Sequence, residues 1–428
     1  MTNKYDNYKY SGVECFGEIP NHWEISRIKN LFIGKSGIGF KEEDQGVLEA
    51  DYPFFKVSDT NNYGNEKYLV NANNYIFKGS KYVSQLIPKD SIIAPKVGEV
   101  LRSNKRRILK SKSVIDNNML ALIPKNENIN TNYFYYLSLF IDFNKYINSG
   151  AVPSINYGQV SIIEILKFPI QEQKLIADYL DEKTSSIDNS IETLKSQKER
   201  LIEQKKAIIH KAVTKGLDDS VEMKDSGVDW IKEIPKNWRI DKLKNSFLFK
   251  KGVDSQKYNK VYVLEEKNKG DYPVYSGQTK DNGVMGKIKT YDYEFESVLF
   301  TTTVGAKFMT PMILKGRFSL SQNCLLIINK NKNKNSNKYY YYYLQSFFEY
   351  EKNKMNNIIT PSLRNEDLEK YIIFKPEIEE QIKIANYLDE KTSKIEEAVN
   401  EVEKQINLLE EYKKTLINDV VTGKIKVF

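Results

Sequence analysis

The sequence YLDEKTS occupies Tyr179–Ser185 and returns, letter for letter, at Tyr387–Ser393. The repeat extends outward, since QEQKLIADYLDEKTSSID and EEQIKIANYLDEKTSKIE agree at twelve of eighteen positions. Self-similarity at a fixed offset is the signature of a duplicated structural unit. The chain is therefore predicted to be two copies of one unit, each of about 210 residues.

Other matched segments locate the borders of the two copies. SGVECFGEIPNHW, which begins at Ser11, matches SGVDWIKEIPKNW, which begins at Ser226. VPSIN, from Val152, likewise matches TPSLR, from Thr360. The middle segments, at 33–150 and 248–356, hardly match. We infer that the flanks keep one shared role while the middles serve different ones.

Each copy closes with a long amphipathic pattern. Apolar residues recur at steps of three and four from Ile187 to Ala212, and again from Ile395 to Val420, which is the period of a coiled-coil seam. A proline precedes each stretch and a glycine follows it, as helix starts and ends prefer. Two antiparallel helices of about 44 residues are predicted. Three lysines interrupt the seam and either fix the pairing or open to solvent: Lys198, Lys205 and Lys413.

The middle segments are predicted to be mixed α and β, because DSIIAPKVGEV and ESVLFTTTVG alternate apolar and polar residues and break at glycine. NYFYYLSLF and YYYYYLQSFF are interpreted as helices packed in the core, with base stacking as the alternative. The predicted fold is α+β: two tandem-repeat globular α/β domains separated by two long antiparallel coiled-coil helices, with pseudo-two-fold symmetry. The predicted segments are a first domain at 1–168, a central helix at 169–216, a second domain at 217–375 and a distal helix at 376–428.

Composition narrows the class of protein. The 428 residues are 40% hydrophobic and carry a formal net charge of +8, which is compatible with nucleic-acid binding. Cys15 and Cys324 lie far apart and form no metal-ligand spacing or disulfide framework, so a reducing cytosol is expected. The polar start resembles no signal peptide, and no apolar run reaches the length of a membrane span. A cytoplasmic location is therefore expected.

Catalytic motifs are incomplete. The sequence GKS at 34–36 resembles the end of a phosphate-binding loop, but Lys29 stands where that motif needs glycine. His22 and His210 have no nucleophile or metal partner nearby in sequence. EEK at 265–267 resembles a nuclease carboxylate–lysine pair without the preceding Pro-Asp. The sequence therefore predicts a chain without catalytic residues and without a metal site.

The duplicated EIPNHW-type opening and the PIQEQKLIADYLDEKTSSID-type closing together resemble the specificity subunit of type I restriction–modification systems, over nearly the whole chain. The resemblance implies that each divergent middle is a target-recognition domain that reads one half of a split DNA target. It implies that the helices set the gap between the halves and dock two modification subunits. These subunits would bind S-adenosylmethionine and methylate adenine, and restriction and translocase subunits would join to cut unmethylated phage DNA. No cofactor is expected on this chain itself.

The resemblance also suggests site residues. Arginine and lysine would grip phosphate or guanine, while serine and glutamine would read bases. The predicted DNA contacts are Lys35, Ser36, Lys56, Arg102, Arg106 and Arg107 in the first domain, and Ser276, Gln278, Lys280, Lys307 and Arg317 in the second. The predicted partner contacts are Gln173, Ile176, Tyr179, Leu180, Gln381, Ile384, Tyr387 and Leu388.

Three other interpretations stay open. A coiled-coil structural adaptor would not bind DNA in a salt-dependent way, and its end domains would be alike. A nuclease or methyltransferase acting alone would be active as a purified chain with magnesium or S-adenosylmethionine. A specificity subunit could also serve a methyltransferase without any restriction subunit.

Overall fold

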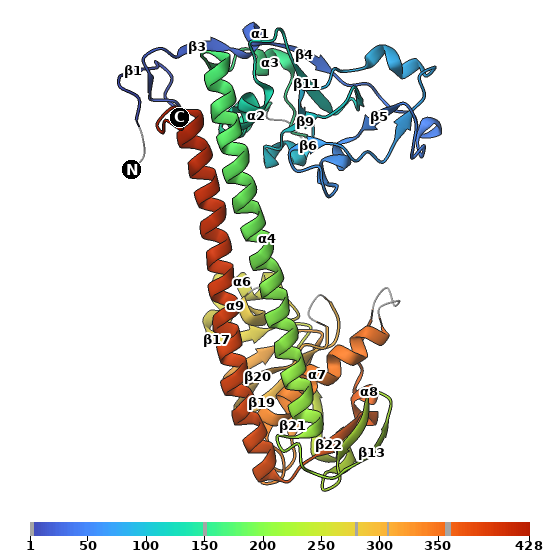
Figure 1. Cartoon of the computed structure of the whole chain (residues 1–428). Helices are drawn as coiled ribbons and strands as arrows, with labels where there is room; N and C mark the ends of the chain where they lie inside the picture. The colour runs from blue at the N-terminus through green and yellow to red at the C-terminus, as the bar shows by residue number, and fades with distance from the viewer. Residues whose placement is uncertain (1–3, 149–151, 279–280, 306–307, 356–360) are drawn as a thin grey trace. The chain divides into compact units, whose positions relative to one another are not determined.

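The chain forms two compact units, and each long helix contributes to both. The computed structural model describes residues 4–148, 152–278, 281–305, 308–355 and 361–428. The first unit combines Met1–Leu194 with Gln405–Phe428, and the second is Lys195–Lys404 (Figure 1). Within the described ranges, no helix has the length and apolar character that a membrane crossing requires.

The first unit is built around a five-stranded sheet of order β4-β11-β8-β9-β6, beside smaller sheets β1-β2, β12-β3 and β10-β5-β7. Its strands are β1 Tyr8–Tyr10, β2 Glu18–Pro20, β3 Glu24–Arg27, β4 Phe32–Ser36, β5 Tyr52–Phe55, β6 Tyr68–Leu69, β7 Tyr75–Ile76, β8 Ile92–Pro95, β9 Arg107–Leu109, β10 Val114–Ile115, β11 Met119–Pro124 and β12 Glu164–Lys167. Its short helices are α1 Ile28–Leu31, α2 Thr131–Phe140 and α3 Tyr157–Ser161, and the long helix α4, Ile170–Lys215, begins here.

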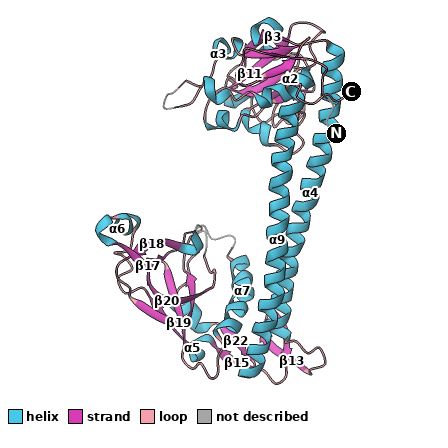
Figure 2. Cartoon of the chain, turned by 90° about the vertical axis from the view of Figure 1, so that its left-hand side faces the viewer, coloured by secondary structure: helices cyan, strands magenta, loops and turns pink. Residues whose placement is uncertain are grey.

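The second unit has a six-stranded sheet of order β16-β21-β19-β20-β17-β18, with the pairs β13-β14 and β15-β22 (Figure 2). Its strands are β13 Met223–Val228, β14 Ile231–Pro235, β15 Arg239–Lys242, β16 Phe247–Lys251, β17 Lys269–Tyr275, β18 Val284–Ile288, β19 Tyr293–Thr302, β20 Met312–Leu320, β21 Cys324–Asn329 and β22 Ile372–Lys375. Its helices are α5 Leu243–Ser246, α6 Lys260–Leu264, α7 Asn337–Lys354, α8 Asn365–Lys370 and α9 Ile378–Val421.

The two units have the same arrangement of flanking elements but different main sheets. Each opens with a hairpin, pairs an early strand with the strand before its long helix, and places an aromatic helix, α2 or α7, ahead of that strand. The main sheets have different strand orders and lengths. The tandem α+β organisation is therefore as predicted, with common flanks and divergent middles.

The aromatic helices are core helices, as predicted. Tyr133, Tyr339, Tyr340 and Tyr343 have 0% relative exposure, so these rings are closed to a nucleic-acid base. They also reach the C-terminal end of a long helix. Tyr133 Oη donates to the Val421 carbonyl oxygen at 3.0 Å in the first unit. The matching bond in the second unit runs from Tyr339 Oη to the Val213 carbonyl oxygen at 3.3 Å.

The long helices run antiparallel to each other within each unit, and the interrupting lysines form ion pairs between the two helices. Lys413 contacts Asp188 at 2.6 Å in the first unit. Lys198 contacts Glu403 and Lys205 contacts Glu396, both at 2.5 Å, in the second unit. A seven-residue step forward along α4 matches a seven-residue step backward along α9, so both units keep one register. α4 begins and ends one residue inside the segment expected from the sequence.

Candidate functional site

The repeated phrase holds an aromatic helix against a long helix in each unit. Tyr136 Oη, on α2, donates to Asp181 Oδ1 at 2.5 Å and lies 3.0 Å from Thr184 Oγ1. Burial and the hydrogen bond to Asp181 raise the pKa of Tyr136, so its hydroxyl stays a donor. We call this set, Tyr136 with Asp181 and Thr184, the first helix anchor.

The same anchor recurs in the second unit from the second copy of the phrase. Tyr342 Oη, on α7, donates to Asp389 Oδ1 at 2.8 Å and lies 3.1 Å from Thr392 Oγ1. Burial raises the pKa of Tyr342 as well. We call these three residues the second helix anchor. The aspartate and threonine of YLDEKTS thus have one structural role in both copies.

A lysine joins each anchor, but it comes from different elements. Lys67, just before β6, pairs with Asp181 and lies 4.9 Å from the ring centre of Tyr136. Burial lowers the pKa of Lys67. In the second unit Lys338, at the start of α7, pairs with Asp389 and is half exposed. The aspartate is therefore the same in both anchors, whereas its lysine partner comes from a different element in each domain.

The glutamine before each phrase fastens the start of its helix. Gln173 Oε1 accepts from the Asn130 backbone N–H at 2.9 Å, and its Nε2 donates to the Phe168 carbonyl oxygen at 2.7 Å. Gln381 repeats this arrangement with Ser336 N and Pro376 O, both at 2.8 Å. Both amides are buried and bonded at both ends, so each joins the long helix to the aromatic helix ahead of it.

We expect Gln173→Ala to lower the free energy of unfolding by about 1–3 kcal/mol, because a buried N–H and a buried carbonyl lose their partners. Urea unfolding followed by circular dichroism measures the change. Lys174→Ala, at the adjacent exposed position, is the control and should change stability by less than about 0.5 kcal/mol. Equal effects of the two substitutions would contradict the role assigned to Gln173.

The opening motif of each copy meets the same helix start. Trp23 Nε1 donates to Glu172 Oε1 at 3.0 Å, and Trp238 Nε1 donates to Glu380 Oε1 at 3.0 Å. In the first unit Glu172 also accepts from Tyr5 Oη at 2.6 Å. The matched motifs therefore converge on one structural junction in each unit, which explains why they diverge little.

Most of the predicted partner contacts lie at this junction. Six of the eight side chains have 0–1% relative exposure and face the interior: Gln173, Ile176, Leu180, Gln381, Ile384 and Leu388. Their burial argues against direct contact with a partner subunit. Tyr179 and Tyr387 are half-buried, and Tyr387 lines a hollow together with Ile208 and Leu217. These two tyrosines stay predicted contacts.

In the first domain, the predicted DNA-contacting side chains are only partly available. Lys56 Nζ donates to Gln45 Oε1 at 2.8 Å. Ser36 is exposed at the end of β4 and accepts from Lys96 Nζ at 2.9 Å. Lys35, half-buried, lies 3.4 Å from the carbonyl oxygen of Leu86. Their position at or beside strand ends leaves them as predicted contacts.

Arg106 has a structural environment that its sequence context did not predict. It has 0% relative exposure, and its guanidinium lies 3.6 Å from the ring centre of Phe143. It donates to the Lys105 carbonyl oxygen and to Asn104 Oδ1, both at 2.8 Å. Burial lowers the pKa of Arg106 to about 9. This burial argues against a DNA contact and assigns Arg106 to the support of its loop.

The neighbouring arginines differ from Arg106. Arg107 is half-buried and donates to the Thr60 carbonyl oxygen at 2.9 Å, so it too braces the loop. Arg102 is exposed and lies 3.2 Å from Glu99 in a surface ion pair. Arg102 is therefore the arginine of this cluster that faces solvent, while sequence alone treated all three alike.

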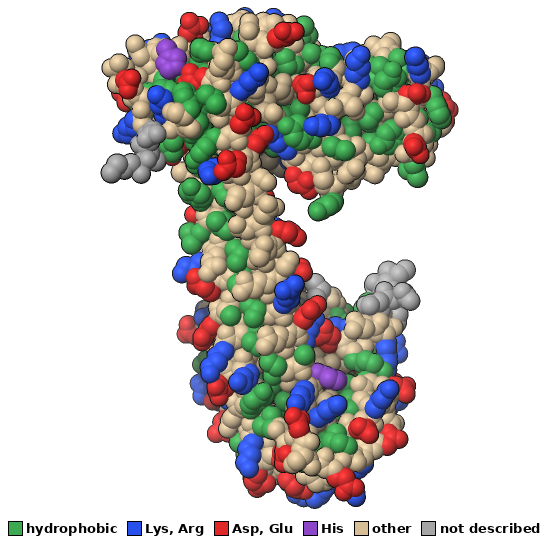
Figure 3. Space-filling view, viewed as in Figure 1, with side chains coloured by type: hydrophobic (Ala, Val, Ile, Leu, Met, Phe, Trp, Pro, Cys, Tyr) green, Lys and Arg blue, Asp and Glu red, His purple; other side chains and the backbone are tan. Residues whose placement is uncertain are grey.

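In the second domain the predicted contacts also separate by exposure. Ser276 is buried and its Oγ lies 3.4 Å from the Gly283 carbonyl oxygen, while Gln278 is half-buried beside it. Arg317 is exposed on β20, 3.1 Å from Glu294 and 5.0 Å from the ring centre of Tyr291. Lys280 and Lys307 lie outside the described residues. On the face in Figure 3, basic and acidic side chains are interspersed.

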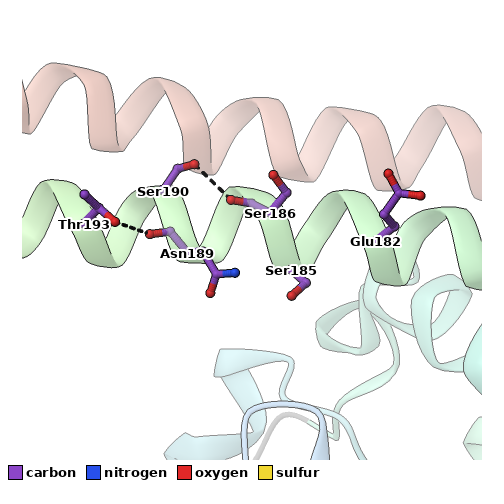
Figure 4. A pocket seen from close by; sticks show the side chains of 6 residues that line it. All are labelled: Glu182, Ser185, Ser186, Asn189, Ser190 and Thr193. Atoms are coloured by element: carbon purple, nitrogen blue, oxygen red, sulfur yellow. Dashed lines mark hydrogen bonds between the residues drawn. The ribbon is translucent and has the colours of Figure 1, made fainter.

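A polar hollow follows the first copy of the phrase along α4 (Figure 4). It is lined by Glu182, Ser185, Ser186, Asn189, Ser190 and Thr193. Ser190 and Thr193 donate to backbone carbonyl oxygens one turn earlier, at 2.9 and 2.8 Å. Among the residues that the structure describes, no group of three or more His, Cys, Asp or Glu could hold a metal ion. The hollow is therefore a polar face of α4.

Comparison with known proteins defines the class. A family model for the type I restriction modification DNA specificity domain matches the chain twice, at residues 20–204 and 235–407. The matches cover most of the chain, which therefore belongs to this family and has the role of a DNA sequence-specificity subunit of a type I restriction–modification system.

Individual relatives agree with this class. The chain is 26% identical over 457 residues to the type I restriction enzyme MjaVIII specificity subunit of Methanocaldococcus jannaschii, covering 99% of this chain and 97% of that protein. A chain from a structure on assembly and conformational transition of the type I R-M system matches with a TM-score of 0.70 at 12% identity, covering 94% of this chain and 98% of that one. The HsdS subunit from Thermoanaerobacter tengcongensis matches with a TM-score of 0.51 at 12% identity, covering 95% and 98%. The structural matches show a shared fold.

Proposed function

We propose that this chain reads a bipartite DNA target, one half with each divergent domain, and docks two modification subunits on its long helices. One observation carries this proposal. The helix anchor, the glutamine and the tryptophan–glutamate contact recur in both units, while the main sheets differ in strand order. These repeated internal contacts hold each long helix in the same way in both units, so the exposed helix faces would be presented alike to two identical partners. Unlike half-sites, in turn, need unlike base contacts.

The two long helices would act as a coiled-coil spacer with pseudo-two-fold symmetry. The common register of the lysine ion pairs in both units supports this arrangement. Rigid helices fix the distance between elements that enter successive grooves of a duplex. The gap of the DNA target would then depend on helix length.

The chemistry would belong to the partners. S-adenosylmethionine would bind the modification subunits, which would methylate adenine flipped out of the duplex. Restriction and translocase subunits would join to complete the cutting complex. This chain would supply recognition and docking without catalytic groups of its own.

The direct test is co-expression of this chain with the adenine methyltransferase subunit encoded beside its gene. Long-read sequencing of host DNA then maps modified adenines. We expect one split motif with a fixed gap, modified only when this chain is present. If the methyltransferase fails to co-purify and no adenine is modified, the structural adaptor becomes the better account.

Within this function, Arg102 is expected to contact phosphate. Arg102→Ala should weaken binding of the complex to specific and nonspecific duplexes alike, and reduce the slope of log affinity against log salt by about one. Fluorescence anisotropy at several salt concentrations measures the slope.

Arg239→Ala is the matched control, because Arg239 is also an exposed arginine paired with a glutamate, Glu377, at 2.8 Å. It should leave the slope unchanged. A slope that is the same for wild type and Arg102→Ala would remove Arg102 from the DNA surface.

A further inference from the structure

The two helix anchors occupy equivalent places along their helices, which gives them a geometric role. In the first unit, the Gln173 tie meets Asn130 at the start of α2, and the anchor ties Tyr136 to Asp181. The second unit spaces the same ties in the same way: six residues along α7 and eight along α9. In addition to its apolar packing, each aromatic helix is therefore tied by polar side chains at two points along one long helix.

Two ties fix the direction of the aromatic helix relative to the long helix, whereas a single tie would fix only the position of one end. Eight residues of α-helix span about 12 Å, so the anchor lies more than two turns beyond the glutamine. Without the anchor, the glutamine is the remaining polar tie to that long helix, and rotation of the aromatic helix is opposed mainly by the packing of its rings and by its tyrosine bond to the other long helix. The aromatic helix carries buried rings that pack into its domain, so a rotation of that helix carries the domain with it.

On the basis of the proposed bipartite reading, we propose that Tyr136 with Asp181 and Thr184, and Tyr342 with Asp389 and Thr392, are positioning residues. They fix the angle of each recognition domain on its helix and thereby set how strictly the complex measures the gap between half-sites. The repeated phrase is thus a specificity determinant for spacing, although none of these side chains needs to touch DNA.

The two anchors differ in one respect that the proposal uses. Lys67 is mostly buried against Asp181, while Lys338 is half exposed beside Asp389. An exposed ion pair contributes little, because water and salt screen it. Lys67→Met should therefore relax the gap preference more than Lys338→Met.

The test uses the complex of this chain with its modification subunits and three duplexes. One duplex has the native gap, found by methylation mapping, and the others have one base pair more or less. Tyr136→Phe and Tyr342→Phe keep the ring and remove the hydroxyl. We expect the methylation rate at the altered gaps, relative to the native gap, to rise about three- to tenfold, as the loss of one typical hydrogen bond implies.

Adjacent tyrosines provide matched controls. Tyr343 Oη donates to the Ile372 carbonyl oxygen at 2.9 Å, so its hydroxyl is bonded to strand β22 of the domain. Tyr135 Oη lies 3.5 Å from the Glu66 carbonyl oxygen, also within its domain. Tyr343→Phe and Tyr135→Phe should leave the ratio of rates unchanged, although they also remove a tyrosine hydroxyl.

The outcomes separate clearly. A raised ratio for the anchor variants alone supports the proposal. If the anchor variants slow all three duplexes in the same proportion, or if the controls raise the ratio equally, the anchors act only on stability and the proposal is wrong. If the wild-type complex methylates none of the duplexes and no motif is found, the bipartite function itself fails, which is a distinct result.

Discussion

Removal of residues 191–197 from α4 together with 404–410 from α9 is expected to shorten the gap of the methylated motif and leave both half-sites unchanged. Each deletion removes seven residues, or about 10.5 Å of helix. The contacts of Lys198 with Glu403 and of Lys413 with Asp188 lie outside the deleted stretches. The antiparallel register therefore continues across the two junctions.

The expected change in the gap follows from the length of helix removed and the rise of DNA for each base pair. DNA rises 3.4 Å for each base pair, so 10.5 Å corresponds to about three base pairs. The duplex also completes a turn every 10–10.5 base pairs, which rotates one half-site relative to the other. We therefore expect a gap shorter by about one to three base pairs, measured by methylation mapping in cells that express the variant.

A single deletion provides the control. Loss of residues 191–197 alone leaves α9 at full length and moves the remaining ion pairs out of register, so methylation should fall to background. An unchanged gap in the double deletion would show that the helices do not measure distance, whatever the half-sites prove to be.

Gly423→Ala is expected to destabilise the chain by about 2–4 kcal/mol. Gly423 ends α9 with φ of +76° in the left-handed region. A Cβ there would lie 2.5 Å from Pro20 Cδ and 3.1 Å from the Trp23 ring. Both the backbone strain and the contact with the opening motif of the first unit oppose it.

Two other glycines separate these contributions. Gly216 ends α4 with φ of +75°, and its Cβ would lie 3.2 Å from Glu380 and 3.5 Å from Trp238. Gly12 has φ of +77° and open space around it. Urea unfolding of the three alanine variants should rank them Gly12, Gly216 and Gly423 in order of increasing loss. An equal loss at all three would show that backbone strain alone decides.

The sequence predicted the features that depend on pattern. Duplication, the antiparallel helices and the buried aromatic helices follow from repeats and periodicity. The predicted boundaries treated 169–216 and 376–428 as separate segments, whereas each helix is divided between two compact units. The division depends on which domain each part of a helix packs against, and such long-range packing leaves little trace in local periodicity.

The DNA-contacting and partner-contacting residues were harder to predict, because the type of a residue does not determine whether its side chain is exposed. Arg102 and Arg106 belong to one basic stretch, yet Arg102 faces solvent while Arg106 stacks on Phe143. The anchors were missed for a related reason. The aspartate and threonine of YLDEKTS sit three residues apart on one helix face, but their tyrosine partner comes from a distant helix.

The division of the helices has a consequence for synthesis on the ribosome. The first unit needs Gln405–Phe428, which are translated some 210 residues after Leu194. At 5–20 residues per second, the nascent first domain waits roughly 10–40 s for the segment that completes it. During that interval the second unit, which is continuous in sequence, can fold first. The order of folding would then run opposite to the order of translation.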